Sequence, residues 1–156
     1  MTIIQNFPLI FLDSHARWHR QHMNMGQLRS GDGVEFLSFH RNFIKVALEW
    51  YSNEGLNPRF VEPWRSIPSA IKRHPEWTRE LQDAENRIVR NLSSFNSSDG
   101  LGRFLQTSSL HDTIHVIGSE VFNEPDFGRI SRAPRSTLFY NWHGLIDTWW
   151  KQLERL

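Results

Sequence analysis

Residues 34–50 read VEFLSFHRNFIKVALEW, and this stretch decides the fold. It is too long for one strand, and its apolar side chains fall on more than one side of a helix, which predicts a buried α-helix. Apolar residues recur at helical rather than alternating spacing in the other long segments. The further predicted helices cover residues 8–25, 75–92, 110–122 and 137–156, with Ser109 as a predicted N-cap.

The segments between these helices are rich in Gly, Pro, Ser and Asp, which favour turns and irregular loops. These connections are residues 26–33, 57–68, 96–102 and 125–134. No segment shows a convincing alternation of apolar and polar residues, which is the pattern typical of a β-strand. The pattern therefore predicts an all-α fold, in which four main helices form a four-helix bundle core joined by long irregular connections.

Length and charge limit the class of protein. The chain has 156 residues, with 18 Lys and Arg against 17 Asp and Glu, so the charge is nearly balanced. We expect a single domain over residues 1–156 that binds no nucleic acid. No apolar run approaches the roughly 20 residues of a membrane span, and the N-terminus makes a poor secretory signal. We therefore expect no membrane partner and a cytoplasmic location.

The chain contains no cysteine, which excludes disulfide frameworks, thiolate metal sites and cysteine nucleophiles. It does contain eight histidines. Imidazole is the commonest nitrogen ligand for zinc, copper and iron in proteins. Metal chemistry with nitrogen and oxygen ligands is thus the first functional hypothesis.

The histidines are arranged in two similar sets. His15 and His19 form one i, i+4 pair, His111 and His115 form another, and each pair places two imidazoles on one helix face about 6 Å apart along the axis. Each pair is followed by a single histidine on another predicted helix. The two sets are His15, His19 and His40, and His111, His115 and His143. Two such sets facing each other would form a dinuclear metal site in the bundle core.

Three motifs around these histidines resemble the tyrosinase family of type-3 dicopper proteins. Residues 36–44, FLSFHRNFI, are similar to F-L-x-W-H-R-x-[FY]-L around the last ligand of the first copper. Residues 111–119, HDTIHVIGS, resemble H-N-x-[VI]-H-x-x-I-G-G, which supplies two ligands of the second copper. Residues 139–150, FYNWHGLIDTWW, are similar to F-W-L-H-H-x-x-[VI]-D-x-x-W, which carries the third. The three motifs occur in the family's order.

The resemblance implies two copper ions (Cu) and O2 as co-substrate. The activity it implies is oxidation or hydroxylation of phenols, o-diphenols or o-aminophenols to o-quinone-type products. The expected partners are a small phenolic substrate and dioxygen, with a copper-delivery protein as a further candidate. The implied metal ligands are His15, His19, His40, His111, His115 and His143.

Four further residues receive roles from the same motifs. Asp112 follows the first ligand of the second copper, where it would accept a phenol proton or hold His111 by a hydrogen bond. Phe139 matches a family phenylalanine near the dicopper centre. Asp147 lies one turn beyond His143 and is the predicted acceptor for that ring. Arg41 is expected to brace a carboxylate elsewhere.

The second ligand of the first copper is open between His19 and His22. In bacterial tyrosinases this ligand lies nine residues before the last one, and that position here is Gly31. His19 is favoured if the first helix continues as far as Gly26, because it then pairs with His15. His22 is favoured if the helix ends early and the following residues fold back.

Three other functions compete with the dicopper enzyme. A non-catalytic protein could bind oxygen or copper at the same site. A mononuclear helical-bundle enzyme could use His40 with His111 and His115. A phosphohydrolase could use the His111-Asp112 doublet with Asp147. A carboxylate-bridged di-iron site is disfavoured because no glutamate lies three residues before any histidine.

Overall fold

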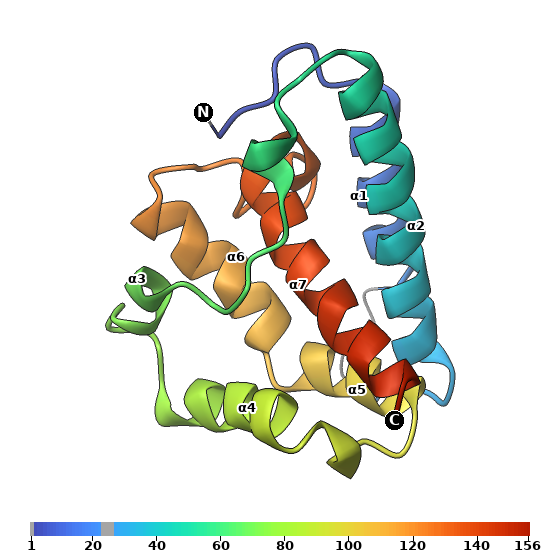
Figure 1. The fold of residues 1–156 in the computed structure, drawn as a ribbon, viewed down its shortest axis with the longest axis vertical. Helices are drawn as coiled ribbons and strands as arrows, with labels where there is room; N and C mark the ends of the chain where they lie inside the picture. The colour runs from blue at the N-terminus through green and yellow to red at the C-terminus, as the bar shows by residue number, and fades with distance from the viewer. Residues whose placement is uncertain (1, 23–26) are drawn as a thin grey trace.

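The computed structural model describes residues 2–22 and 27–156 and confirms the all-α class (Figure 1). Within these residues there are seven α-helices and no strand, and one isolated antiparallel bridge joins Ile3 to Ser136. The α-helices are α1 (Leu9–Gln21), α2 (Asp32–Asn53), α3 (Ser69–Lys72), α4 (Arg79–Arg90), α5 (Ser98–Thr107), α6 (Leu110–Val121) and α7 (Thr137–Glu154). Short 3-10 helices are η2 (Pro58–Val61), η3 (Leu92–Ser94) and η4 (Ala133–Arg135).

The predicted helices correspond to α1, α2, α4, α6 and α7, with differences at their ends. The prediction that the first helix continues to Met25 is wrong, because α1 ends at Gln21 and His22 is its C-cap; Met25 and Gly26 themselves lie outside the described residues. Ser109 is at the N-cap position of α6, but its side chain makes no capping hydrogen bond. The Leu110 N–H instead lies 3.4 Å from Ser108 Oγ. No described helix is both long enough and apolar enough to cross a membrane.

The prediction of a loop over residues 96–102 is wrong, because α5 begins at Ser98. Ser97 caps this helix, accepting a hydrogen bond from the Gly100 N–H at 3.0 Å. Leu101 and Leu105 then lie one turn apart and are fully buried. Two glycines in the first half of α5 made the segment resemble a loop.

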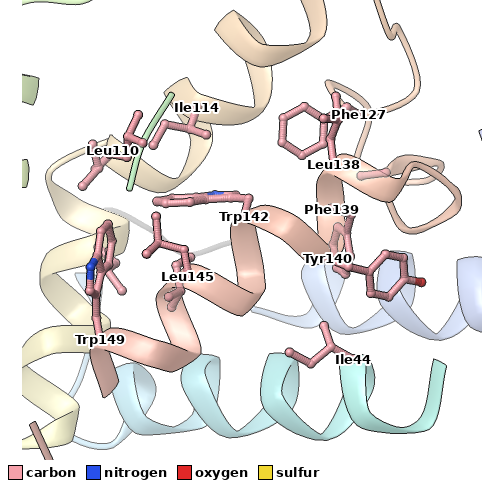
Figure 2. Close-up of a cluster of buried hydrophobic side chains, with 14 of the residues drawn as sticks. Ile44, Leu110, Ile114, Phe127, Leu138, Phe139, Tyr140, Trp142, Leu145 and Trp149 are labelled. Atoms are coloured by element: carbon pink, nitrogen blue, oxygen red, sulfur yellow. The ribbon is translucent and has the colours of Figure 1, made fainter. Parts of the chain in front are cut away.

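Helix α7 runs through the centre of the molecule, with α2 on one side and α6 on the other (Figure 1). Figure 2 shows Trp142 pointing from α7 toward Leu110 and Ile114 of α6, while Ile44 of α2 lies on the opposite side of α7. Trp142 is fully buried, and Trp149 and Trp150 are nearly so, as expected for core packing rather than a substrate pocket. Packing of the helices as a regular four-helix bundle stays a prediction.

The start of α2 is fixed against α5 by backbone contact. Asp99 Oδ1 accepts hydrogen bonds from the N–H groups of Gly31, Gly33 and Val34, at 3.0, 2.9 and 3.2 Å. Gly33 and Gly102 face each other so closely that a Cβ on Gly102 would lie 2.0 Å from the Gly33 oxygen. Because α2 carries His40, this contact also helps to position the candidate site.

Gly102→Ala is therefore expected to destabilise the fold by about 3 kcal/mol or more, since two helix backbones would have to separate. The matched control is Gly100→Ala in the same helix, where the new Cβ would approach only Ser97 Oγ, at 3.5 Å. That change should be neutral or stabilise by up to about 1 kcal/mol, because alanine is the better helix former. Urea unfolding of both variants measures the difference. Equal stability of the two would contradict the proposed close contact.

Candidate metal centre

Six buried or half-buried histidines converge where four helices meet. His15 and His19 come from α1, His40 from α2, His111 and His115 from α6, and His143 from α7. Each of the two predicted sets thus combines an i, i+4 pair from one helix with a single histidine from another. The structure places all six predicted ligands in one cluster.

The first set brings three ring nitrogens together. One nitrogen each of His15, His19 and His40 lies within 4.8 Å of the other two. The Nε2 atoms of His15 and His19 are 3.1 Å apart. Two nitrogens bound to one tetrahedral metal at about 2.0–2.1 Å would be about 3.3 Å apart, so this pair already has a suitable separation.

The second set is centred on His143. Its Nε2 lies 3.2 Å from Nε2 of His115 and 3.5 Å from Nε2 of His111. The two sets are neighbours, because the rings of His40 and His143 stack with centroids 4.4 Å apart and planes 2° from parallel. One nitrogen each of His40, His111 and His143 also lies within 4.8 Å of the others. The groupings whose nitrogens all lie this close are His15, His19 and His40, and His40, His111 and His143, and each could hold a metal ion. No such grouping of the described residues includes His115, whose Nε2 approaches that of His143 at 3.2 Å.

Hydrogen bonds on the outer side of the cluster fix which nitrogen carries the proton in three of the six rings. Nδ1 of His15 donates to the Ile130 carbonyl at 2.9 Å, Nδ1 of His40 to Phe36 at 2.8 Å, and Nδ1 of His115 to Phe127 at 2.8 Å. Because a carbonyl oxygen only accepts, these Nδ1 atoms hold the proton, and in the neutral ring Nε2 presents a lone pair. Metal-binding histidines commonly have such an outer partner.

Two of these carbonyls come from the connection between α6 and α7, which the sequence indicated only as an irregular loop. Residues 125–134 thus help to orient one histidine in each set. A main-chain carbonyl can be supplied by any residue type, so the sequence held no signal for this role.

The donor set fits a metal ion. His40 Nε2 is buried and has no hydrogen-bond partner within the described part of the chain. Buried polar atoms are nearly always satisfied, so an unpartnered lone pair beside other imidazole nitrogens points to a cation as its partner. The facing Nε2 atoms, 3.1–3.5 Å apart, need a proton or a metal between each pair, because two lone pairs at this distance would repel.

Asp112 lies at the edge of the cluster. Its Oδ1 accepts a hydrogen bond from His111 Nδ1 at 2.8 Å, which directs His111 Nε2 toward His143. Burial raises the pKa of Asp112, but the hydrogen bond from His111 and the nearby imidazoles outweigh burial, and the pKa is lowered. An ionised carboxylate here is suited to holding His111, one of its two predicted roles.

The predicted role of Asp147 is wrong. Both of its oxygens are engaged by cations, one by Arg41 and the other by Lys151 Nζ at 2.7 Å. The buried Nδ1 of His143 has no partner among the described residues. The expectation that Arg41 braces a carboxylate is confirmed, because Arg41 pairs with both Asp147 and Glu154 and lies over the Trp150 ring. Asp147 is equally unavailable as a phosphohydrolase ligand.

His22 lies outside the cluster. Its Nδ1 is 2.7 Å from the Trp18 carbonyl oxygen and its Nε2 is 2.9 Å from Glu35 Oε1, so both ring nitrogens have protein partners. Its ring also stacks on Trp18. His74 is elsewhere, 3.2 Å from Glu120 Oε2.

Phe139 is fully buried between the two sets, with its ring centroid 4.2 Å from that of His143 and 5.1 Å from that of His15.

Five of the six clustered histidines are uncharged at neutral pH. Burial, reinforced by the neighbouring imidazoles, holds the pKa values of His15, His40 and His143 well below the ordinary 6.5. Burial likewise lowers the pKa of His19 to about 4 and that of His115 to about 3. Neutral imidazoles are the form that binds a metal, so these rings need not lose a proton first.

The lowered pKa values predict acid sensitivity of the metal-free protein. Above pH 6.5 these histidines are neutral in both the folded and unfolded chain, so they do not affect stability. Below it only the unfolded chain takes up protons, and each group costs about 1.4 kcal/mol of stability per pH unit until its folded pKa is reached. His19 and His115 alone should then lower the free energy of unfolding by about 3 kcal/mol at pH 5.5.

Urea unfolding of the metal-free protein at pH 7.0 and 5.5 measures this loss. A double variant, His19→Asn with His115→Asn, should lose less stability between the same two pH values, because two of the titrating groups are gone. An equal free energy of unfolding at the two pH values in the native protein would contradict the prediction.

Comparison with protein-family models, with curated proteins and with solved structures finds no match for this chain. What the centre does is therefore inferred from its geometry together with the sequence motifs.

Proposed function

We propose that the chain is a type-3 dicopper oxidoreductase of the tyrosinase kind, which uses O2 to oxidise or hydroxylate small phenols. The observation that carries this proposal is the arrangement of the six imidazoles. The nitrogens of His15, His19 and His40 form one close group. In the second set His143 contacts both His111 and His115, and the two sets adjoin through the stacked rings of His40 and His143. The order of the three sequence motifs supports the same family.

Copper suits the donors of this site. Within the described residues the cluster offers imidazole nitrogens, and the carboxylate that contacts it, Asp112, bonds to one of these imidazoles. Neutral imidazoles suit copper in both the +1 and +2 states, and three ligands per ion leave a position open. Bound copper would supply the electron transfer between phenol and O2.

The chain's own residues would orient the reactants and handle protons. The carbonyls of Phe36, Phe127 and Ile130 hold three rings in position, so a substrate oxygen would meet a preformed site. Phe139 closes its inner side. Asp112 has one oxygen bonded to His111, and the other is available to accept a proton from an incoming phenol.

A second candidate function is a mononuclear metal enzyme. His40, His111 and His143 are within 4.8 Å of one another, so one ion could take a nitrogen from each of three helices. This grouping differs from the mononuclear set expected from sequence, in which His115 replaces His143. It would leave the contact between His15 and His19 without a function.

Metal analysis with oxygen uptake tests the proposal. Purified protein is loaded with Cu(I) under anaerobic conditions, desalted and analysed for copper, and O2 uptake is followed with catechol and with phenol. Two copper ions per chain and catechol-dependent O2 uptake are expected. One ion per chain, or retention of zinc with exclusion of copper, would overturn the dinuclear proposal. Two copper ions per chain without O2 uptake in the presence of any phenol would favour a non-catalytic protein that binds oxygen or copper.

A further inference from the structure

A cavity of about 170 Å³ opens directly over the histidine cluster. Its lining is mainly apolar apart from the imidazole edges and Asp112. The lining residues include the imidazoles of His15, His19, His111 and His115 and the apolar side chains of Val116, Phe127 and Ile130. A dry cavity of about 150 Å³ is enough to hold benzene, so this one matches a single aromatic ring.

A second cavity of about 120 Å³ adjoins the first. Both are lined by His19, His111, Asp112 and Ile130. The residues that line only the second are Trp18, His22, Phe36 and Gln106. Asp112 therefore lies where the two cavities meet, together with Ile130 and the imidazoles of His19 and His111. An aromatic ring bound in the first cavity would thus have the Asp112 carboxylate in its wall.

The charge at the boundary is negative. Asp112 is the only carboxylate among the described residues that line the two cavities, and none of those residues is Lys or Arg. Its side chain is 54% exposed, and only Oδ1 is bonded to His111. Oδ2 has no partner within the described chain, so it can face a group on the substrate.

We propose that Asp112 selects substrates by charge, so that the site takes single-ring phenols and catechols with a cationic or neutral side chain and disfavours those with a carboxylate. This inference rests on the proposed function, because it describes the substrate of the same site. Two unit charges a few ångströms apart near a protein surface interact strongly enough to change affinity about tenfold. The sign of that interaction reverses between an ammonium and a carboxylate.

Binding to the metal-free protein tests the selection independently of catalysis. Benzylammonium, benzyl alcohol and benzoate are similar in size and differ in charge, and their dissociation constants can be measured by NMR titration. We expect benzylammonium to bind at least about tenfold more tightly than benzoate, with benzyl alcohol between them. In Asp112→Asn, which keeps an oxygen to accept the His111 hydrogen bond, this ratio should fall at least about fivefold.

The control is Glu120→Gln, which removes a negative charge from the same helix but from a residue that lines neither cavity. Its ratio should equal that of the native protein. An unchanged ratio in Asp112→Asn, or an equal fall in Glu120→Gln, would overturn the inference.

Turnover by the copper-loaded protein gives the second measurement. Dopamine, 4-methylcatechol and 3,4-dihydroxyphenylacetate share the reacting ring and carry a cationic, a neutral and an anionic substituent. Their kcat/KM values should decrease in that order, and Asp112→Asn should reduce the spread by about tenfold. Absence of turnover with all three would overturn the proposed function, whereas the binding ratios would still decide the role of Asp112. Turnover with a spread that Asp112→Asn leaves unchanged would overturn the charge selection alone.

Discussion

His143→Ala is expected to lower the bound copper from two ions to one per chain and to reduce catechol-dependent O2 uptake by at least about a thousandfold. His143 Nε2 is the nitrogen that His111 and His115 both face, at 3.5 and 3.2 Å. Without it the second set keeps only two imidazoles from one helix. The first set lies on α1 and α2 and retains all three of its nitrogens.

The control for this variant is Thr148→Ala on the same helix, where the hydroxyl bonds only to the Gly144 carbonyl within its own helix. Because alanine leaves a cavity at the buried position 143, His143→Gln provides a second variant with a larger side chain. Both His143 variants should keep one copper, measured by elemental analysis after desalting. Loss of all metal would indicate the mononuclear site of His40, His111 and His143, and retention of two ions would remove His143 from the ligands.

The sequence was sufficient to predict that the six histidines lie close together. The apolar periodicity of residues 34–50 and 137–156 predicted the two helices that carry the single histidines, and i, i+4 spacing placed each pair on one face. These are local patterns within one element, and a helix expresses them wherever it packs. The four helices meet because their apolar faces are buried in the same core.

Interactions between distant segments were not predictable in the same way. In the sequence, Gly100 and Gly102 are typical of a loop. Helix α5 nevertheless needs glycine at Gly102, because the α2 backbone approaches it there. The Asp99 carboxylate looks like any helix-start acid in sequence, but it accepts three N–H groups from the start of α2. Such contacts join residues more than sixty positions apart, so no local pattern marks them.

Asp147 shows the same limit. One turn beyond His143, it was expected to accept a hydrogen bond from that ring, but the Arg41 guanidinium is a stronger partner. The ion pair between Arg41 and Asp147 instead connects the two helices that carry the single histidines. Arg41 directly follows His40 on α2, and Asp147 lies on the helix of His143, so their ion pair ties together the two helices whose histidine rings stack.

The choice between His19 and His22 gives the second large effect. His19→Ala is expected to leave about one copper per chain and to lower O2 uptake at least about a hundredfold, whereas His22→Ala should keep two ions and most of the activity. His19 contributes its Nε2 beside that of His15, while both ring nitrogens of His22 are engaged by Trp18 and Glu35. His19 lies in the last turn of α1 and His22 is the C-cap of the same helix, so each variant serves as the control for the other.

The comparison also separates the dinuclear from the mononuclear site. A single ion on His40, His111 and His143 would not need His19, so His19→Ala would then leave the metal content unchanged. Loss of one ion in His22→Ala together with two ions in His19→Ala would instead assign the ligand to His22. That outcome would require the His22 ring to leave both Glu35 and the face of Trp18, on which it stacks 4.3 Å away. The existing contacts of His22 therefore oppose its use as a ligand, whereas His19 needs no comparable rearrangement.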